Sequence, residues 1–132
     1  MIQGLERFFR TALVDRTPSV SAAALVSSYH LYPQARDIIK RWANEVNEAL
    51  SKPPASAFSS TGGIQSTSAI SQYHALGLLY AIRDKDRMAV TKLVQGLSGS
   101  GSTRGSSSTL RNPLAICMLV RYAAKLMDED PK

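Results

Sequence analysis

Apolar residues recur at helical spacing along most of the chain, in six stretches separated by polar or proline-containing segments. Near the start, Ile2, Leu5 and Phe9 fall on one face of a helix. Helices are predicted over about residues 2–14, 18–31, 34–50, 69–83, 86–97 and 112–127. No segment alternates apolar and polar residues for long enough to predict a strand. The pattern predicts an all-α fold.

Proline and capping residues mark where three of these helices begin. Thr17-Pro18 and Asn112-Pro113 place a capping side chain before a proline, whose missing N–H costs nothing in the first turn. Tyr32-Pro33 ends the second helix and opens the third. In the third helix we expect Trp42 at the flank of a buried stripe made of Ile39, Ala43, Val46 and Leu50.

Two segments have a composition that predicts flexible loops. Residues 52–68 combine adjacent prolines and glycines with many hydroxyl side chains, and residues 98–109 are almost all serine, glycine and threonine. Such segments bury too little apolar surface to offset the entropy lost on ordering them. We therefore expect each loop to join the two helices of a pair.

The predicted helices form three pairs, at about residues 2–31, 34–83 and 86–127. In each pair the first helix is amphipathic and the second is richer in small apolar residues, as in helical-hairpin repeats. The predicted architecture is an alpha-alpha superhelix, a solenoid of the HEAT or armadillo type, with about six helices in three antiparallel pairs. A six-helix globular bundle is the alternative.

Small residues in the second helix of each pair let neighbouring backbones approach closely. Ala24, Gly77 and Ala124 are therefore predicted at helix–helix contacts. The first helix begins without a capping residue, whereas terminal repeats normally present a polar outer face. This difference predicts a single helical-repeat fragment of a longer trunk solenoid.

A formal net charge of +6 favours an anionic partner, although the basic residues are dispersed. Two clusters are candidates for a partner-binding surface: Arg36, Lys40 and Arg41, and then Arg83, Lys85 and Arg87. Asp84 and Asp86 interrupt the second cluster. Solvated helix faces are the alternative interpretation of both clusters.

The sequence contains no recognisable catalytic constellation, and we predict no catalytic residue, cofactor or metal site. Cys117 is the single cysteine, which excludes an internal disulfide and favours a cytosolic protein. It lies in an apolar helix and is predicted to be a buried, inert thiol. His30 and His74 are predicted to pack between helices or bond to backbone groups rather than act as general bases. No signal peptide or membrane-spanning stretch is present.

A basic helical nucleic-acid-binding module remains an alternative function. It would require a continuous basic stripe with aromatic side chains placed to stack on bases. This sequence mixes acidic residues among its cations, and its aromatic residues are predicted to lie on buried stripes. We therefore expect no nucleic-acid partner.

Four strings carry a resemblance to a known family: "VDRTPSVSAAALVSSYHL", "DIIKRWANEVNEA", "QYHALGLLYAIRDKDRMAV" and "NPLAICMLVRYAAKL". Together they resemble the N-terminal trunk of the coatomer gamma-subunit family, over nearly all six predicted helices in order. Strings such as "ALVSS" and "QYHALGLLY" are specific beyond their periodicity. The two loops are longer than this family leads us to expect.

The resemblance implies a non-catalytic adaptor segment of the COPI vesicle coat, which an Arf-type small GTPase recruits to Golgi membranes. Golgi-to-ER and intra-Golgi transport would be the process. The implied partners are the coatomer zeta and beta subunits and the Arf-type GTPase. The implied location is the cytoplasm, with peripheral association on Golgi membranes and COPI-coated vesicles. A trunk fragment of a related clathrin-adaptor subunit is the nearest alternative.

Overall fold

The computed structural model describes residues 2–51, 65–98, 110 and 112–129. These residues form seven helices and no strand: α1 (Ile2–Leu13), α2 (Pro18–Leu31), α3 (Arg36–Lys40), α4 (Ala43–Ser51), α5 (Gln65–Arg83), α6 (Arg87–Leu97) and α7 (Pro113–Asp128). The all-α prediction is confirmed. The flexibility predicted for residues 52–64 and 99–109 lies outside the described residues.

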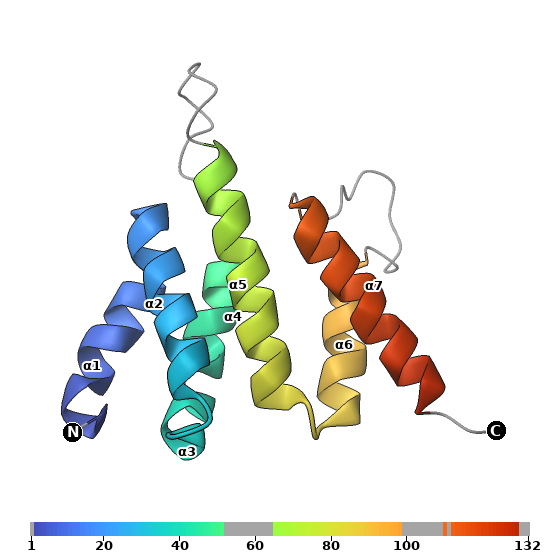
Figure 1. The fold of residues 1–132 in the computed structure, drawn as a ribbon, viewed down its shortest axis with the longest axis horizontal. Helices are drawn as coiled ribbons and strands as arrows, with labels where there is room; N and C mark the ends of the chain where they lie inside the picture. The colour runs from blue at the N-terminus through green and yellow to red at the C-terminus, as the bar shows by residue number, and fades with distance from the viewer. Residues whose placement is uncertain (1, 52–64, 99–109, 111, 130–132) are drawn as a thin grey trace.

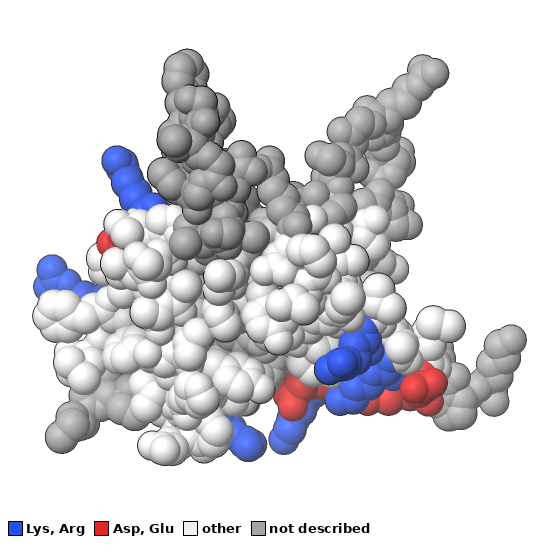
Figure 2. Space-filling view, turned by 45° about the horizontal axis from the view of Figure 1, so that its top comes forward, with Lys and Arg blue, Asp and Glu red and all other residues white. Residues whose placement is uncertain are grey.

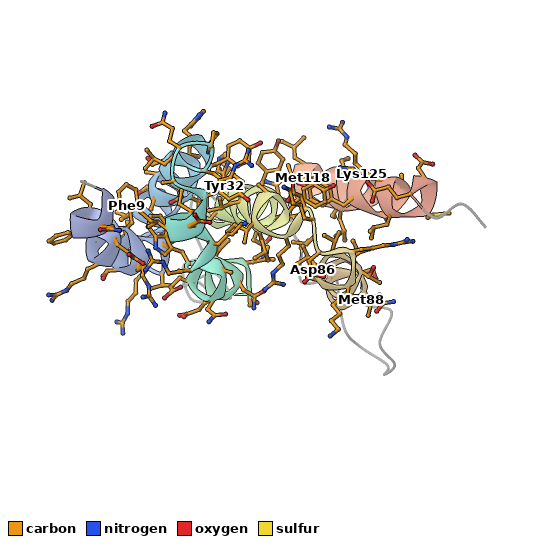
Figure 3. The ribbon with its side chains drawn as sticks, turned by 90° about the horizontal axis from the view of Figure 1, so that it is seen from below. Phe9, Tyr32, Asp86, Met88, Met118 and Lys125 are labelled. Atoms are coloured by element: carbon orange, nitrogen blue, oxygen red, sulfur yellow. The ribbon has the colours of Figure 1, made fainter. Side chains whose placement is uncertain are left out.

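The helices stack side by side along the long axis of the molecule (Figure 1). α1 packs against α2, α4 against α5, and α6 against α7. Between these hairpins, α2 packs extensively against α5, and α5 also contacts α7. We call α2, α5 and α7 the inner layer, because they lie together on one side of α4 and α6 (Figure 3). This is the helical-hairpin stack expected of a HEAT or armadillo-like superhelix.

α5 occupies the centre of the stack and contacts α2, α3, α4, α6 and α7. Its sequence is apolar on most sides because it has neighbours on most sides. Leu76, Leu78 and Leu79 are all fully buried, as is Leu25 on α2. The hydroxyl of Ser71 on α5 donates to the carbonyl oxygen of Pro18 at 3.1 Å, so a polar contact also joins α5 to α2.

The helix predicted over residues 34–50 is instead two helices. α3 begins at Arg36 and ends at Lys40, and α4 begins at Ala43. At the break, the backbone N–H of Arg41 donates to the carbonyl of Ile38 at 3.1 Å, and the N–H of Trp42 donates to the carbonyl of Ile39 at 2.9 Å. These bonds span three residues rather than four, which tightens the chain into a turn.

The break places Trp42 in the core rather than at the flank of a helix. Its side chain is fully buried. The indole ring stacks on Phe9 with centroids 5.5 Å apart, and its N–H donates to Glu6 at 3.1 Å. Trp42 therefore anchors the second helical pair to α1.

Helix boundaries otherwise follow the local signals closely. Asn112 caps α7, because its side-chain oxygen accepts from the N–H of Leu114 at 2.8 Å. Thr17 holds the capping position of α2 in an extended conformation but makes no side-chain capping bond. α5 begins at Gln65 rather than near residue 69, so the predicted loop over residues 52–68 is helical at its end.

Two of the three small residues expected at helix contacts lie there. Ala24 is buried, and a Cβ on Gly77 would lie 3.8 Å from the side chain of Met118 on α7. The prediction for Ala124 is wrong, because this residue is exposed. Cys117 is exposed too, contrary to its predicted burial. The described helices cover one side of α7, and both residues lie away from that side.

Candidate functional site

The predicted cations gather at one edge of the helical stack. α3 and the corner between α5 and α6 lie at the same edge (Figure 1), and α3 contacts α5. We call this region the basic edge; its residues are Arg36, Lys40, Arg83, Lys85 and Arg87. Figure 2 shows Lys and Arg side chains interleaved with Asp and Glu along an edge of the molecule.

Tyr32 lies near both parts of the basic edge, α3 and the corner between α5 and α6. The guanidinium of Arg36 lies 5.8 Å from the centre of the Tyr32 ring. Burial raises the pKa of the Tyr32 hydroxyl, the Asp84 carboxylate raises it further, and Arg36 lowers it. Tyr32 is therefore within electrostatic reach of both α3 and the corner after α5.

Arg41, one of the predicted cations, and Asp86, an acidic residue of the second cluster, each make a contact within the fold. Arg41 forms an ion pair with Glu6 on α1 at 3.7 Å. The Asp86 carboxylate accepts from the N–H of Ala89 at 3.1 Å and caps α6. Five of the six predicted cations thus lie on α3 or around the corner between α5 and α6, and Arg41 pairs with α1. Whether they bind a partner remains a prediction.

Next to the basic edge, a groove of about 590 Å³ crosses the inner layer. We call it the tyrosine groove. Its lining comes from α2 (Leu25, Val26, Tyr29, His30), α5 (Tyr73, His74, Gly77, Tyr80, Ala81), the turn after α5 (Asp84) and α7 (Met118, Tyr122, Lys125). Met118 lies where α5 meets α7, and Lys125 lies further along α7 (Figure 3).

The tyrosines of the groove form a cluster. Tyr80 and Tyr122 stack with centroids 3.7 Å apart and planes 6° from parallel. Burial strongly raises the pKa of the Tyr122 hydroxyl, and the nearby hydroxyls of Tyr80, Tyr29 and Tyr73 raise it further. Tyr122 therefore keeps its proton throughout the physiological pH range and can act as a hydrogen-bond donor.

Lys125 closes one end of the groove. Its ammonium lies 5.5 Å from the centre of the Tyr80 ring. A side-chain hydrogen bond with Tyr80 raises the pKa of Lys125, and the Tyr80 oxygen and the carboxylates of Glu129 and Asp84 also favour the charged form. This end of the groove therefore carries a firmly held positive charge beside the carboxylate of Asp84.

The two histidines differ in their surroundings. Burial lowers the pKa of His74, which favours the neutral imidazole near pH 7. Each histidine was expected to pack between helices or to bond to backbone groups, and the first of these is wrong for His30, which is exposed. Each histidine meets the preceding tyrosine edge-on, at 6.2 Å for Tyr29–His30 and 5.4 Å for Tyr73–His74. Together these side chains offer aromatic surface and hydrogen-bond donors, which suit recognition of a partner.

Comparison with known proteins decides the family. The adaptin N-terminal region family matches residues 1–132. The chain belongs to the adaptin N-terminal region family. This chain is also similar to coatomer subunit gamma of Drosophila melanogaster, with 47% identity over 130 residues. It is 44% identical over 129 residues to coatomer subunit gamma-2 of Takifugu rubripes, and 41% identical over 130 residues to coatomer subunit gamma-1 of Homo sapiens.

Each comparison covers 98% of this adaptin-family chain and 12% of the relative. The chain thus spans a small part of the length of the relatives that it matches. The resemblance to coatomer gamma subunits predicted from the sequence is confirmed. In the part of the adaptin-family chain that the structure describes, no helix is long and apolar enough to cross a membrane. The same part contains no group of three His, Cys, Asp or Glu residues that could hold a metal ion.

Sequence reasoning missed the tyrosine groove of this adaptin-family chain. It placed the aromatic residues on buried stripes, yet Tyr29 is 52% exposed. A signal was available in the strings "SSYHL" and "SQYHAL", which repeat a Tyr-His pair in α2 and α5. The pair is exposed in α2 and partly buried in α5, and both pairs line the groove.

Proposed function

We propose that the chain is a structural, non-catalytic segment of a COPI coat subunit. The observation that carries this proposal is 41–47% identity to coatomer gamma subunits over 98% of the chain. Coat subunits of this kind would work in the cytoplasm and peripherally on Golgi membranes and COPI vesicles, in Golgi-to-ER and intra-Golgi transport. The relatives named above are coatomer subunits, which favours this proposal over a clathrin-adaptor trunk.

The stacked hairpins suit a scaffold because each helical pair is fixed to the next. Trp42 anchors the second pair to α1, and the Tyr80–Tyr122 stack joins α5 to α7. A stack held in this way keeps the basic edge and the tyrosine groove at constant separation. Several modest contacts to neighbouring coat subunits would then reinforce one another, because each bound site raises the local concentration at the next.

A retention experiment tests the proposal. The chain is immobilised and incubated with the purified coatomer zeta subunit, the beta subunit and a GTP-loaded Arf-type GTPase. We expect retention of at least one of them, and none on an unrelated helical-repeat protein. Circular dichroism verifies that the immobilised preparation is helical. A helical chain that retains none of the three would contradict the scaffold proposal.

We also propose that the basic edge contributes to assembly. Arg36 and Lys40 are exposed on α3, and their joint reversal to Glu should weaken association with coatomer or with acidic liposomes, more strongly at low salt. Reversal of Arg41 is unsuitable, because it would place two carboxylates together at Glu6. The matched control reverses Arg16 and Lys92, which are exposed outside this edge. Equal binding by both double variants would show that the edge is a solvated surface.

A further inference from the structure

The tyrosine groove presents aromatic surface that no described helix covers. Tyr29 is 52% exposed on the α2 side, and Tyr73 and Tyr80 on α5 are partly exposed. Gly77 and Met118 also line the groove, and a Cβ on Gly77 would lie 3.8 Å from the Met118 side chain, so the two residues form a continuous floor. A volume of about 590 Å³ lies within the usual range of about 300–1,000 Å³ for ligand sites. The groove is therefore large enough to hold side chains of a partner.

A lysine and a carboxylate line the end of the groove that meets the basic edge. These residues are Lys125 and Asp84. Lys85 follows Asp84 in the chain and is exposed, and the guanidinium of Arg36 lies 5.8 Å from the centre of the Tyr32 ring. Lys125 also approaches Glu129 at 3.9 Å, but both side chains are more than half exposed. Because water screens such a pair, the ammonium remains open to a further carboxylate.

We propose that the tyrosine groove binds an acidic, amphipathic peptide segment of a partner protein. An apolar side chain of the peptide would lie on the floor that Gly77 and Met118 form together. Its carboxylates would accept hydrogen bonds from tyrosine hydroxyls and pair with Lys125. Tyrosines suit this task because they supply a large contact area with little loss of conformational freedom. The inference deepens the proposed scaffold function, on which it rests, by naming the chemistry of one partner.

The charge of the chain supports the choice of an acidic peptide. The net charge is +6, and Lys125 gives the groove an exposed cation. A purely anionic polymer would need no aromatic groove, and a flat lipid surface would not reach a floor set between three helices. An amphipathic peptide uses both features, the apolar floor and the charged end.

Selection from a random peptide library, displayed on phage and panned against the intact chain, tests the proposal. We expect enrichment of peptides that combine Asp or Glu with Leu, Ile, Phe or Met. The most enriched peptide is then synthesised with a fluorophore, and its affinity is measured by anisotropy at low and moderate salt. Tyr29→Ala and Lys125→Glu should each weaken binding about tenfold or more, because each removes a central contact. Tyr29→Phe keeps the ring and removes only the hydroxyl, so its affinity shows how much of the Tyr29→Ala loss comes from the hydroxyl.

Lys92→Glu is the matched control, since it makes the same charge change at an exposed site on α6 outside the groove. Its affinity should stay close to that of the unmodified chain. Enrichment of basic peptides, or no enrichment over beads without the chain, would overturn the proposal. The proposal would also be overturned if the selected peptides bound the Tyr29→Ala and Lys125→Glu variants as tightly as the unmodified chain. Tighter binding of single-stranded DNA or of phosphatidylserine vesicles than of any peptide would overturn it as well. Retention of coat subunits is a separate readout, so failure here is distinguishable from failure of the scaffold function.

Discussion

The ring of Tyr80 on α5 stacks face to face on the ring of Tyr122 on α7, with centroids 3.7 Å apart. The contact joins two inner-layer helices from different helical pairs. It also forms a wall of the tyrosine groove, so the same two residues serve the packing of the stack and the shape of its candidate binding surface.

The Tyr80–Tyr122 stack should be detectable as a coupling energy. We expect a double-mutant cycle with Tyr80→Ala and Tyr122→Ala to give a coupling of about 0.5–1.5 kcal/mol in the free energy of unfolding, as is typical of aromatic pairs. Urea unfolding followed by circular dichroism supplies the four values. Tyr80 paired with Phe9 on α1 is the control, because distant residues contribute additively. A coupling no larger than that of the control pair would show that the stack does not hold α7 in place.

Gly77 lies in the interior of α5, where glycine is unfavourable for a helix. A Cβ at this position would meet the Met118 side chain at an ordinary contact distance of 3.8 Å. We therefore expect Gly77→Ala to raise the free energy of unfolding by about 0.5–1 kcal/mol. Gly96→Ala on α6, where the added Cβ meets nothing within 4 Å, gives the effect of helix propensity near a helix end. A loss of stability in Gly77→Ala would mean that α5 and α7 approach more closely than described.

Because of His74, we expect the free energy of unfolding to fall in mild acid. Burial lowers its pKa below the ordinary value of 6.5. On acidification the unfolded chain therefore takes up a proton at His74 before the folded chain does. The stabilising contribution is complete above the unfolded pKa and is lost as the pH falls towards the folded pKa.

Urea midpoints measured across a pH series check this behaviour. His74→Gln should flatten the decline in stability on acidification, because the titrating group is gone. His30→Gln removes an exposed histidine on α2 and should retain most of the decline. If both substitutions change the pH dependence equally, the burial of His74 is not its cause.

Two buried serines should differ in their response to loss of the hydroxyl. Ser21 donates to the carbonyl of Leu13 at 2.7 Å, and Leu13 ends α1, where carbonyls have no partner within the helix. Ser21→Ala should therefore lower the free energy of unfolding by about 1–3 kcal/mol, because a polar group loses its bond.

Ser28→Ala provides the matched comparison. The Ser28 hydroxyl donates to the carbonyl of Ala24 at 2.7 Å within α2. This carbonyl keeps the ordinary backbone bond of a helix interior after the substitution. Chemical denaturation of both variants should show the smaller loss for Ser28→Ala. A larger loss for Ser28→Ala would contradict the role of Ser21 as the partner of the Leu13 carbonyl at the end of α1.

The sequence by itself determined the class of fold and most helix boundaries. Asn112-Pro113 starts α7 because both residues act locally, through a side-chain cap and a fixed backbone angle. The apolar spacing over residues 69–83 likewise predicted a helix, which is α5. These signals depend on residues a few positions apart, so they can be identified from the sequence alone.

Tertiary structure decided which helical faces are covered. Helical periodicity predicted Trp42 at the flank of a buried stripe, but the structure buries it against Phe9 and Glu6 of α1, which are far away in the sequence. Residues Cys117 and Ala124 look like core positions, yet they are exposed because the described helices pack against one side of α7. The tyrosine groove arises in the same way, from the spacing of α2, α5 and α7. Burial depends on contacts between residues far apart in sequence, and helical periodicity contains no information about those distances.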